Sequence, residues 1–197
     1  MKAGRHRTFD KDIALDKAME VFWTNGYPGT SLTDLTTAMG INKPSLYSAL
    51  GNKEELFKHA LNLYVQKYGL IHVKHLFTAD KPLNERVQCY LLSIAKMVSD
   101  PKLPGGCFVA ISSCEVNGNC LPSDALDAII EINKVTKSSF IEFFNAEQLA
   151  GNISNERSVE MMANYLITLQ YGIAIMARSG IKFEELKEVI QHAINNF

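Results

Sequence analysis

Apolar side chains recur every three or four residues along most of this chain, the spacing that places them on one face of an α-helix. No segment alternates apolar and polar residues as a half-buried strand does. The pattern therefore predicts an all-α protein of about nine helices. Turn-forming clusters separate them, and we expect helices at about residues 10–25, 31–39, 42–50, 52–72, 83–98, 107–116, 122–145, 155–179 and 183–196.

Capping residues mark the ends of several of these helices. Ser31 with Asp34 and Asn52 with Glu55 have the spacing of capping boxes, in which side chains satisfy free backbone N–H groups. Gly40 ends a helix, because glycine adopts the left-handed conformation at little cost. The first helix begins at Asp10, and we expect its core face to be Ile13, Ala14, Ala18, Val21 and Phe22.

Residues 31–53 are the most informative segment. Two short helices are expected there, joined by a tight turn. Asn42 can cap the second helix, and Pro44 lies in its first turn, where the missing N–H costs nothing. Leu46 and Leu50 lie one turn apart and face inward, so the small polar and basic side chains face outward. This is a helix-turn-helix whose second helix can enter a major groove, and the sequence therefore predicts a DNA-binding protein.

The stretch from Thr8 to about Lys67 resembles the DNA-binding domain of TetR-family transcriptional regulators. The resemblance rests on TFDKDIALDKAMEVFWTNGY, TSLTDLTTAMGI and NKPSLYSALGNKEELF, and the Gly-Ile-x-x-Pro-Ser-Leu-Tyr core is much narrower than a general helix-turn-helix. It implies a DNA-binding domain at residues 1–52 and an effector-binding and dimerisation domain at residues 53–197. It also implies a cytoplasmic, homodimeric regulator, usually a repressor, that binds an inverted-repeat operator in double-stranded DNA.

Outward side chains around the helix-turn-helix are the candidate DNA contacts. Lys43 suits guanine O6 and N7, Ser45 reads several bases weakly, and Pro44 suits a thymine methyl. Helix starts and the basic N-terminal arm are better placed for phosphates or the minor groove. Two alternatives stay open: Tyr47 as a half-buried core aromatic, and the arm as a solvated tail. The candidates are Arg5, Arg7, Thr30, Ser31, Thr33, Lys43, Pro44, Ser45, Tyr47, Ser48 and Lys53.

The segment 155–178 is apolar on nearly all sides, which a helix on a monomer surface cannot be. Its seam positions alternate spacings of three and four residues, as in a coiled coil, and the last helix adds a second stripe. We expect these helices to pack against their symmetry mates as a four-helix bundle; a monomer core that covers both faces is the alternative. The expected interface is Val159, Met162, Leu166, Leu169, Ile173, Met176, Leu186, Ile190 and Ile194.

Aromatic residues gather in the expected central helices. The resemblance implies an effector bound within the helical bundle of each subunit, and these residues are its expected wall, although such aromatics are also ordinary core. Few charges fall in the same segments, which favours a largely apolar or aromatic effector. The expected pocket residues are Tyr90, Cys107, Phe108, Ile111, Phe140, Phe144, Tyr165 and Tyr171.

Cys107 raises an alternative function. It follows Pro104-Gly105-Gly106 at an expected helix start, where the helix dipole stabilises a thiolate, and part of the family shares the Gly-Cys pair. A repressor that senses oxidants or electrophiles through this thiol is therefore the alternative to a ligand-responsive one. Against it, Cys107 shares a helical face with Ile111 and Cys114, and buried cysteine commonly serves as a small apolar side chain.

Composition excludes other classes. The net charge of −1 is too near neutral for a nucleic-acid coat or a polybasic membrane binder. No apolar run follows the basic start or approaches the roughly 18 residues of a membrane span, so we expect neither a signal peptide nor a membrane helix. The four cysteines lack paired short spacings, which indicates a reducing cytosol.

Motifs for catalysis are absent from the sequence. It has no phosphate-cradling glycine loop, no nucleophile elbow and no metal-spaced His/Cys cluster. We expect His59, His72 and His75 to be surface histidines, because no third ligand accompanies the i, i+3 pair. The expectation is therefore no enzyme, no metal and no cofactor. A DNA-architectural protein without an effector is a further alternative, which would not need so large a helical body.

Overall fold

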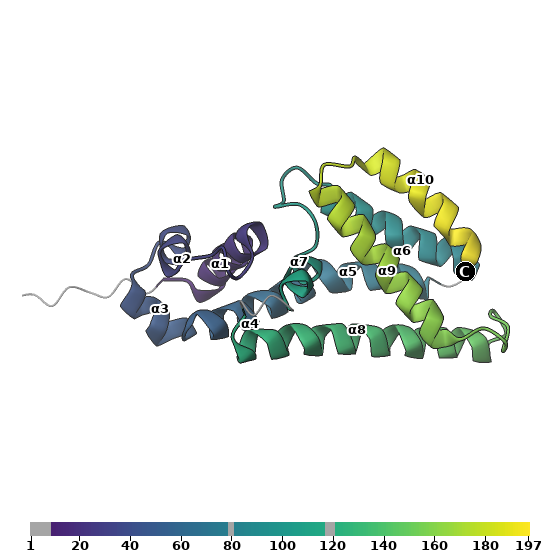
Figure 1. Cartoon of the computed structure of the whole chain (residues 1–197), viewed down its shortest axis with the longest axis horizontal. Helices are drawn as coiled ribbons and strands as arrows, with labels where there is room; N and C mark the ends of the chain where they lie inside the picture. The colour runs from purple at the N-terminus through teal and green to yellow at the C-terminus, as the bar shows by residue number, and fades with distance from the viewer. Residues whose placement is uncertain (1–8, 79–80, 117–120) are drawn as a thin grey trace, which may run out of the picture.

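The computed structural model describes residues 9–78, 81–116 and 121–197, and within these ranges all regular secondary structure is helical (Figure 1). The all-α prediction is confirmed. The α-helices are α1 (Lys11–Asn25), α2 (Leu32–Met39), α3 (Lys43–Leu50), α4 (Lys53–Tyr64), α5 (Leu70–Val73), α6 (Leu83–Val98), α7 (Phe108–Glu115), α8 (Ser123–Leu149), α9 (Val159–Arg178) and α10 (Phe183–Ala193). Short 3₁₀ turns follow α5 (Lys74–Phe77) and α10 (Ile194–Asn196).

A continuous helical rod joins the two ends of the molecule (Figure 1). It consists of α4, a π-helical turn at Val65–Gly69, and α5, and we call it the rod. Counting the rod once, the described residues form nine helices, as the sequence predicted. The boundaries differ most at α8, which continues to Leu149, and at α9, which begins only after its cap Ser158.

The predicted caps are confirmed. The Asp10 carboxylate accepts from the backbone N–H groups of Asp12 and Ile13 at the start of α1. Capping boxes open α2 at Ser31 and α4 at Asn52. Each cap satisfies backbone donors that a helix leaves free at its N-terminus, and these contacts lie within three residues in sequence. The ends of α1, α2 and α4 are therefore set locally.

Helices α1, α2 and α3 form the N-terminal unit around the beginning of the rod, and α6, α8, α9 and α10 form the larger end of the molecule (Figure 1). The expectation for α1 was wrong at Ile13, which is 63% exposed. The core-facing stripe of α1 is instead centred on a row of residues four apart, and it packs on α2 and α4. The buried residues of α1 are Ala14, Ala18, Met19, Phe22 and Trp23.

A buried ion pair ties α6 to α8. The guanidinium of Arg86 donates to both carboxylate oxygens of Glu147, with 2.9 Å from Nη1 to Oε1, and also to the backbone oxygen of Leu76. The Glu147 carboxylate further accepts from the side-chain amide of Asn152 at 2.8 Å. Hydrogen bonding from Arg86 lowers the pKa of Glu147 below its ordinary value. The pair therefore stays ionised at neutral pH.

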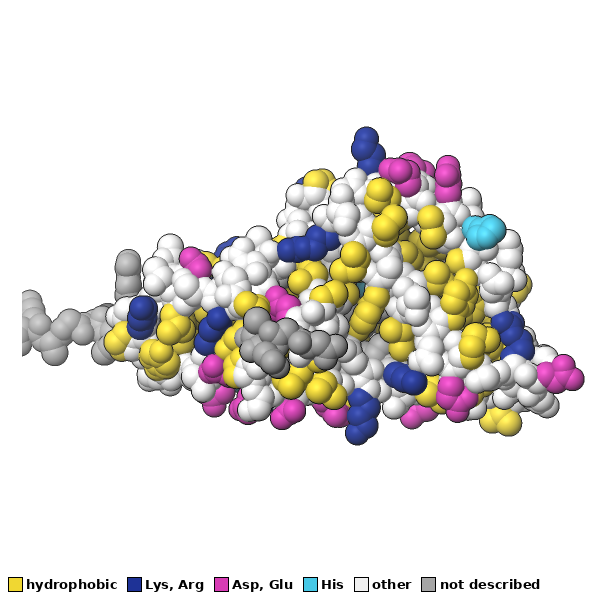
Figure 2. All heavy atoms as spheres, in the orientation of Figure 1, with side chains coloured by type: hydrophobic (Ala, Val, Ile, Leu, Met, Phe, Trp, Pro, Cys, Tyr) yellow, Lys and Arg dark blue, Asp and Glu magenta, His cyan; other side chains and the backbone are white. Residues whose placement is uncertain are grey.

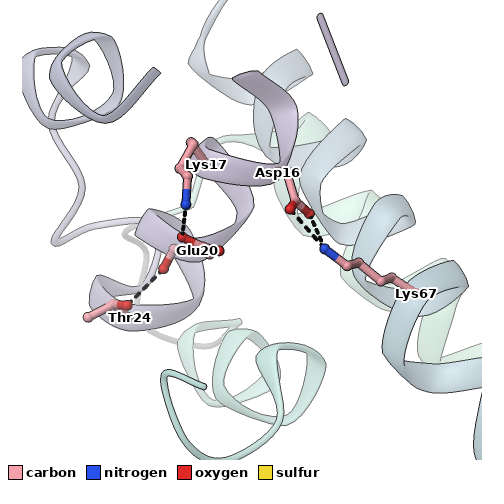
Figure 3. A network of polar contacts seen from close by, with 5 residues as sticks. All are labelled: Asp16, Lys17, Glu20, Thr24 and Lys67. Atoms are coloured by element: carbon pink, nitrogen blue, oxygen red, sulfur yellow. Dashed lines mark hydrogen bonds and ion pairs between the residues drawn. The ribbon is translucent and has the colours of Figure 1, made fainter. Parts of the chain in front are cut away.

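Replacing Arg86 by methionine should strongly destabilise the fold, because it leaves the Glu147 carboxylate buried without its partner. We expect Arg86→Met to lower the free energy of unfolding by about 3–5 kcal/mol. The control is Lys17→Met, which breaks the exposed Lys17–Glu20 pair (Figure 3) and should leave the free energy of unfolding almost unchanged, because solvent screens the pair. Urea denaturation at neutral pH measures both, and equal losses would contradict the role given to the buried pair.

Candidate nucleic-acid interface and internal cavity

The turn between α2 and α3 presents one face of α3 to solvent. Gly40 adopts a left-handed conformation with φ of 66°, and Asn42 caps α3 by accepting from the Ser45 N–H at 2.9 Å. Leu46 and Leu50 are buried as predicted. The opposite face of α3 carries the candidate contacts, of which Lys43, Pro44, Tyr47 and Ser48 are exposed and Ser45 is half-buried. Tyr47 is 51% exposed, so it is not a core aromatic.

The start of α2 contributes only part of the expected set. Ser31 and Thr33 are exposed, although the Ser31 hydroxyl also accepts from the Asp34 N–H as the cap. Thr30 differs from the expectation, because it is 2% exposed and its hydroxyl donates to the backbone oxygen of Gly26 at 2.6 Å. That bond closes the turn after α1 and leaves the Thr30 side chain with almost no exposed surface.

Lys53 also differs from the expected phosphate contact. Its ammonium group donates to the backbone oxygen of Tyr27 at 2.7 Å and lies 4.0 Å from the centre of the Tyr27 ring. Partial burial lowers the pKa of Lys53 below its ordinary value. The side chain therefore joins the start of α4 to the turn after α1. The expected contacts Arg5 and Arg7 lie outside the described residues.

Two sets of side-chain contacts tie α1 to the rod around its π-helical turn. Asp16 accepts from the Lys67 ammonium in the π-helical turn, at 2.6 and 2.8 Å (Figure 3). The Trp23 ring packs against Tyr64 and Tyr68, with ring centres 4.8 and 5.2 Å apart. Aromatic pairs in this geometry add stability beyond the area they bury. The rod is therefore held to α1 at its π-helical turn.

The end of α1 is held by α7 and α9. The guanidinium of Arg178, at the end of α9, donates to the backbone oxygens of Trp23 and Thr24 at 3.3 and 2.6 Å, and to that of Gly105 at 3.2 Å. The carboxylate of Glu115 accepts from the Tyr27 N–H at 3.2 Å. A cation near a helix C-terminus also interacts favourably with the helix dipole. These bonds join the N-terminal unit to the larger end.

A cavity of about 440 Å³ lies against the rod, between α6, α8 and α9. This volume is in the range of pockets that hold small organic molecules. Four of the eight expected pocket residues line it: Tyr90, Cys107, Phe140 and Tyr171. The hydroxyls of Tyr90 and Tyr171 are bonded within the protein, to Gln170 and Asn133, each at 2.6 Å.

The other four expected pocket residues lie outside the cavity wall. Phe108 is fully buried between Phe57 and Tyr64, where it joins α7 to the rod. Phe144 and Tyr165 pack on the C-terminal Phe197. Ile111 is partly buried against the core. Each of these residues serves packing, because aromatic spacing predicts burial without indicating which side of a helix adjoins a cavity.

Sequence reasoning missed the wall that the rod contributes. Tyr64, Tyr68 and His72 lie at intervals of four residues and all line the cavity, together with Phe77 and Phe143. Their regular spacing was the signal that could have found them. The expectation of a surface histidine was wrong for His72, which is 4% exposed. Burial lowers its pKa to about 4, so its imidazole is neutral at neutral pH.

The expected dimer seam is mostly buried within the protomer. Six of its nine residues are less than 9% exposed and pack against α6 and α8, so they are not available to a partner: Val159, Met162, Leu166, Ile173, Leu186 and Ile190. Leu169 and Ile194 are partly buried. Of the nine, only Met176 is well exposed, at 45%. The periodic pattern therefore marked the side of each helix that faces its own chain.

A different face of α9 and α10 is apolar and open. Met161, Ile175 and Met176 on α9 and Val189 on α10 are 38% to 51% exposed. Figure 2 shows apolar side chains gathered over these two helices on the larger end of the molecule. A contiguous exposed apolar patch on a protein commonly marks a site of contact with another protein. This face, which contains Met176 but none of the buried seam residues, is the candidate interface.

Two further features concern other classes of site. Among the described residues, no three His, Cys, Asp or Glu side chains are grouped to hold a metal ion. None of the described helices is both long and apolar enough to span a membrane.

The sequence matches the family described as bacterial regulatory proteins, tetR family, over residues 14–60. It is 31% identical to the HTH-type transcriptional repressor ComR of Escherichia coli (strain K12), over 94% of this chain and 88% of that protein. It is 25% identical to the repressor BdcR of the same strain, over 93% and 86% of the two chains.

Solved structures are also similar to this protein over most of its length. A cysteine mutant of the TetR family transcriptional regulator CifR, complexed with 26-bp operator DNA, has a TM-score of 0.82 and 30% identity and covers 98% of both chains. The reduced form of E. coli NemR has a TM-score of 0.78 at 18% identity, over 93% of this chain and 94% of that one, and shows likeness of fold alone.

Cys107 should react slowly with alkylating reagents. It is 7% exposed, and burial raises its pKa, contrary to the lowering expected at a helix start. We expect iodoacetamide to modify the exposed Cys114 before Cys107 in the folded protein. Mass spectrometry of peptides from a time course measures both rates, and denatured protein provides the control. Faster modification of Cys107 than of Cys114 would show that the thiol is activated.

Proposed function

Because the chain belongs to the TetR family of bacterial transcriptional regulators, we propose that it is a repressor that binds operator DNA and releases it when a small, largely apolar or aromatic effector occupies the cavity. One observation carries the proposal: the rod is attached to the N-terminal unit at one end and forms a wall of the cavity further along. The repressors ComR and BdcR, and CifR in complex with operator DNA, support it.

We assign base reading to the exposed start of α3. Lys43 is the donor for guanine O6 and N7, with Pro44 and Ser45 beside it. Tyr47 and Ser48, one turn further on, meet phosphate oxygens, as do Ser31 and Thr33 at the start of α2. Lys53 takes a supporting role, since its ammonium group is bonded to the Tyr27 backbone.

The active assembly in this proposal is a homodimer on an inverted repeat. Residues 1–52 bind DNA, and residues 53–197 hold the effector and pair through the open apolar face of α9 and α10. A two-fold symmetric protein matches a two-fold symmetric site, so each half-site meets one α3 helix. Pairing also removes that apolar face from water, which favours association.

Effector binding acts on DNA through α1 in this scheme. A molecule in the cavity contacts Tyr64 and Tyr68, which are packed against Trp23. The neighbouring Lys67 holds Asp16. A shift of the rod therefore reaches the N-terminal unit through direct contacts and changes the separation of the two α3 helices. Coupling of about 1–3 kcal/mol between two sites is ordinary for such regulators.

The alternatives are less well supported. A thiol switch at Cys107 requires a reactive thiolate, and burial in the cavity wall raises the pKa of this group. An electrophile would first have to enter the cavity. A DNA-architectural protein without an effector has no use for a cavity of about 440 Å³.

Purified protein should select an inverted repeat from a pool of random duplex DNA. Half-site centres should lie about 34–36 Å apart or at a multiple of this distance, so that both α3 helices meet one face of the duplex. Sequencing after several rounds of binding gives the repeat and its spacing. Gel filtration with light scattering gives the oligomeric state. Absence of any enriched sequence would overturn the proposal.

Substitutions on α3 should separate base reading from phosphate contact. Lys43→Ala should change the base preference at one step of the selected site, by about 1–3 kcal/mol. Tyr47→Phe removes only a hydroxyl and should weaken binding to every site variant alike, by about 0.5–1.5 kcal/mol. Titration of single-base variants at one salt concentration measures both. Identical base preferences in the two mutants would refute this division of roles.

A further inference from the structure

Nε2 of His72, in the cavity wall, has no hydrogen-bond partner among the described residues. The Tyr64 hydroxyl, also in the wall, has only the neighbouring Cys107 thiol, which is a weak partner. Both side chains are almost fully buried, at 4% and 2% exposure. Buried polar atoms in proteins are nearly always hydrogen-bonded, so each exception requires an explanation. A bound molecule with a polar group would supply the missing partner.

The His72 ring is held in place by its other nitrogen. Nδ1 and the hydroxyl oxygen of Ser93 on α6 are 2.7 Å apart, a hydrogen bond that either tautomer can make. Burial, together with the nearby His75 and Lys74, lowers the pKa of His72 to about 4. Nε2 therefore offers a neutral donor or acceptor to the cavity and no positive charge.

The buried part of the remaining wall, as far as the structure describes it, offers no partner for a charged group. No lysine or arginine is among the described residues that line the cavity. Glu131 is the single carboxylate among these described residues, and it is exposed. A charge buried without a counter-ion is strongly unfavourable. Both anions and cations are therefore poor ligands for the interior.

The edge of the cavity is apolar as well. Leu70, Phe77 and Val135 belong to its lining and are 50%, 65% and 53% exposed. Aromatic rings of Tyr68 and Phe140 continue this surface inward. Stacked and edge-to-face contacts with such rings favour planar aromatic molecules.

We propose that the cavity binds an uncharged aromatic molecule whose hydroxyl or carbonyl group hydrogen-bonds to His72 Nε2 and the Tyr64 hydroxyl. This inference rests on the proposed function only in taking the cavity as the effector site. Tyr64 is the last residue of α4, directly before the π-helical turn, and His72 lies in α5, directly after it, so the ligand bonds to both parts of the rod.

Three probes of similar shape test the ligand class: 2-naphthol, naphthalene and 2-naphthoate. Calorimetric titration of the full-length protein, without DNA, measures their affinities. The neutral 2-naphthol should bind at least about tenfold more tightly than the anionic 2-naphthoate. The affinity for 2-naphthol should also exceed the affinity for naphthalene, which lacks the hydroxyl, by about three- to tenfold. Equal or tighter binding of 2-naphthoate, or binding of none of the three, would overturn the proposal.

Three variants test the anchors. Tyr64→Phe and His72→Phe should each lose the preference for 2-naphthol over naphthalene while keeping the affinity for naphthalene, which also reports that the cavity is intact. The matched control is Tyr165→Phe, because this ring packs on Phe197 outside the cavity wall and loss of its hydroxyl should leave the preference unchanged. Retention of the preference in both Tyr64→Phe and His72→Phe would overturn the assignment.

The same titrations separate this proposal from the proposed function. A selective response to 2-naphthol in protein that does not bind a selected operator would reject the repressor and leave the ligand class standing. Operator binding by a protein that binds none of the three probes would reject the ligand class and leave the repressor standing.

Discussion

The contact between α1 and the rod is the constraint on which the rest of the structure depends. One side of the rod, at its π-helical turn, holds α1 through the Lys67–Asp16 pair and through Trp23. Another side forms a wall of the cavity. Since α2 packs on α1 and α3 packs on α2, the direction of α3 follows from that one junction. The bonds from Arg178 and Glu115 hold the same junction from α9 and α7.

Features decided within a few residues could be predicted from the sequence. The caps at Ser31 and Asn52, the left-handed Gly40 and the inward Leu46 all follow from local spacing, and so the helix-turn-helix was predictable. Features decided by distant partners were not. The Thr30 hydroxyl bonds the turn after α1, and Lys53 bonds Tyr27 26 residues away, which no helical pattern indicates. The π-helical turn likewise lacks a sequence signal.

The predicted dimer seam shows the same difference between what local spacing indicates and what distant partners decide. Periodicity correctly marked Leu166 and Ile190 as buried, but burial has the same pattern whether the covering surface belongs to the same chain or to a second copy. Aromatic spacing had the same ambiguity: it included Phe108, which packs against the rod, and omitted Tyr68, which lines the cavity. Only the three-dimensional arrangement distinguishes a core from an interface or a cavity wall.

Trp23 gives the molecule a spectroscopic property of its own. It is the single tryptophan of the chain, it is fully buried, and its ring lies against two tyrosines that line the cavity. Its backbone oxygen also accepts from Arg178. Indole emission depends on the polarity and the neighbours of the ring, so a change at this junction alters the fluorescence of the unlabelled protein. The chain therefore carries an intrinsic optical reporter between its cavity and its helix-turn-helix.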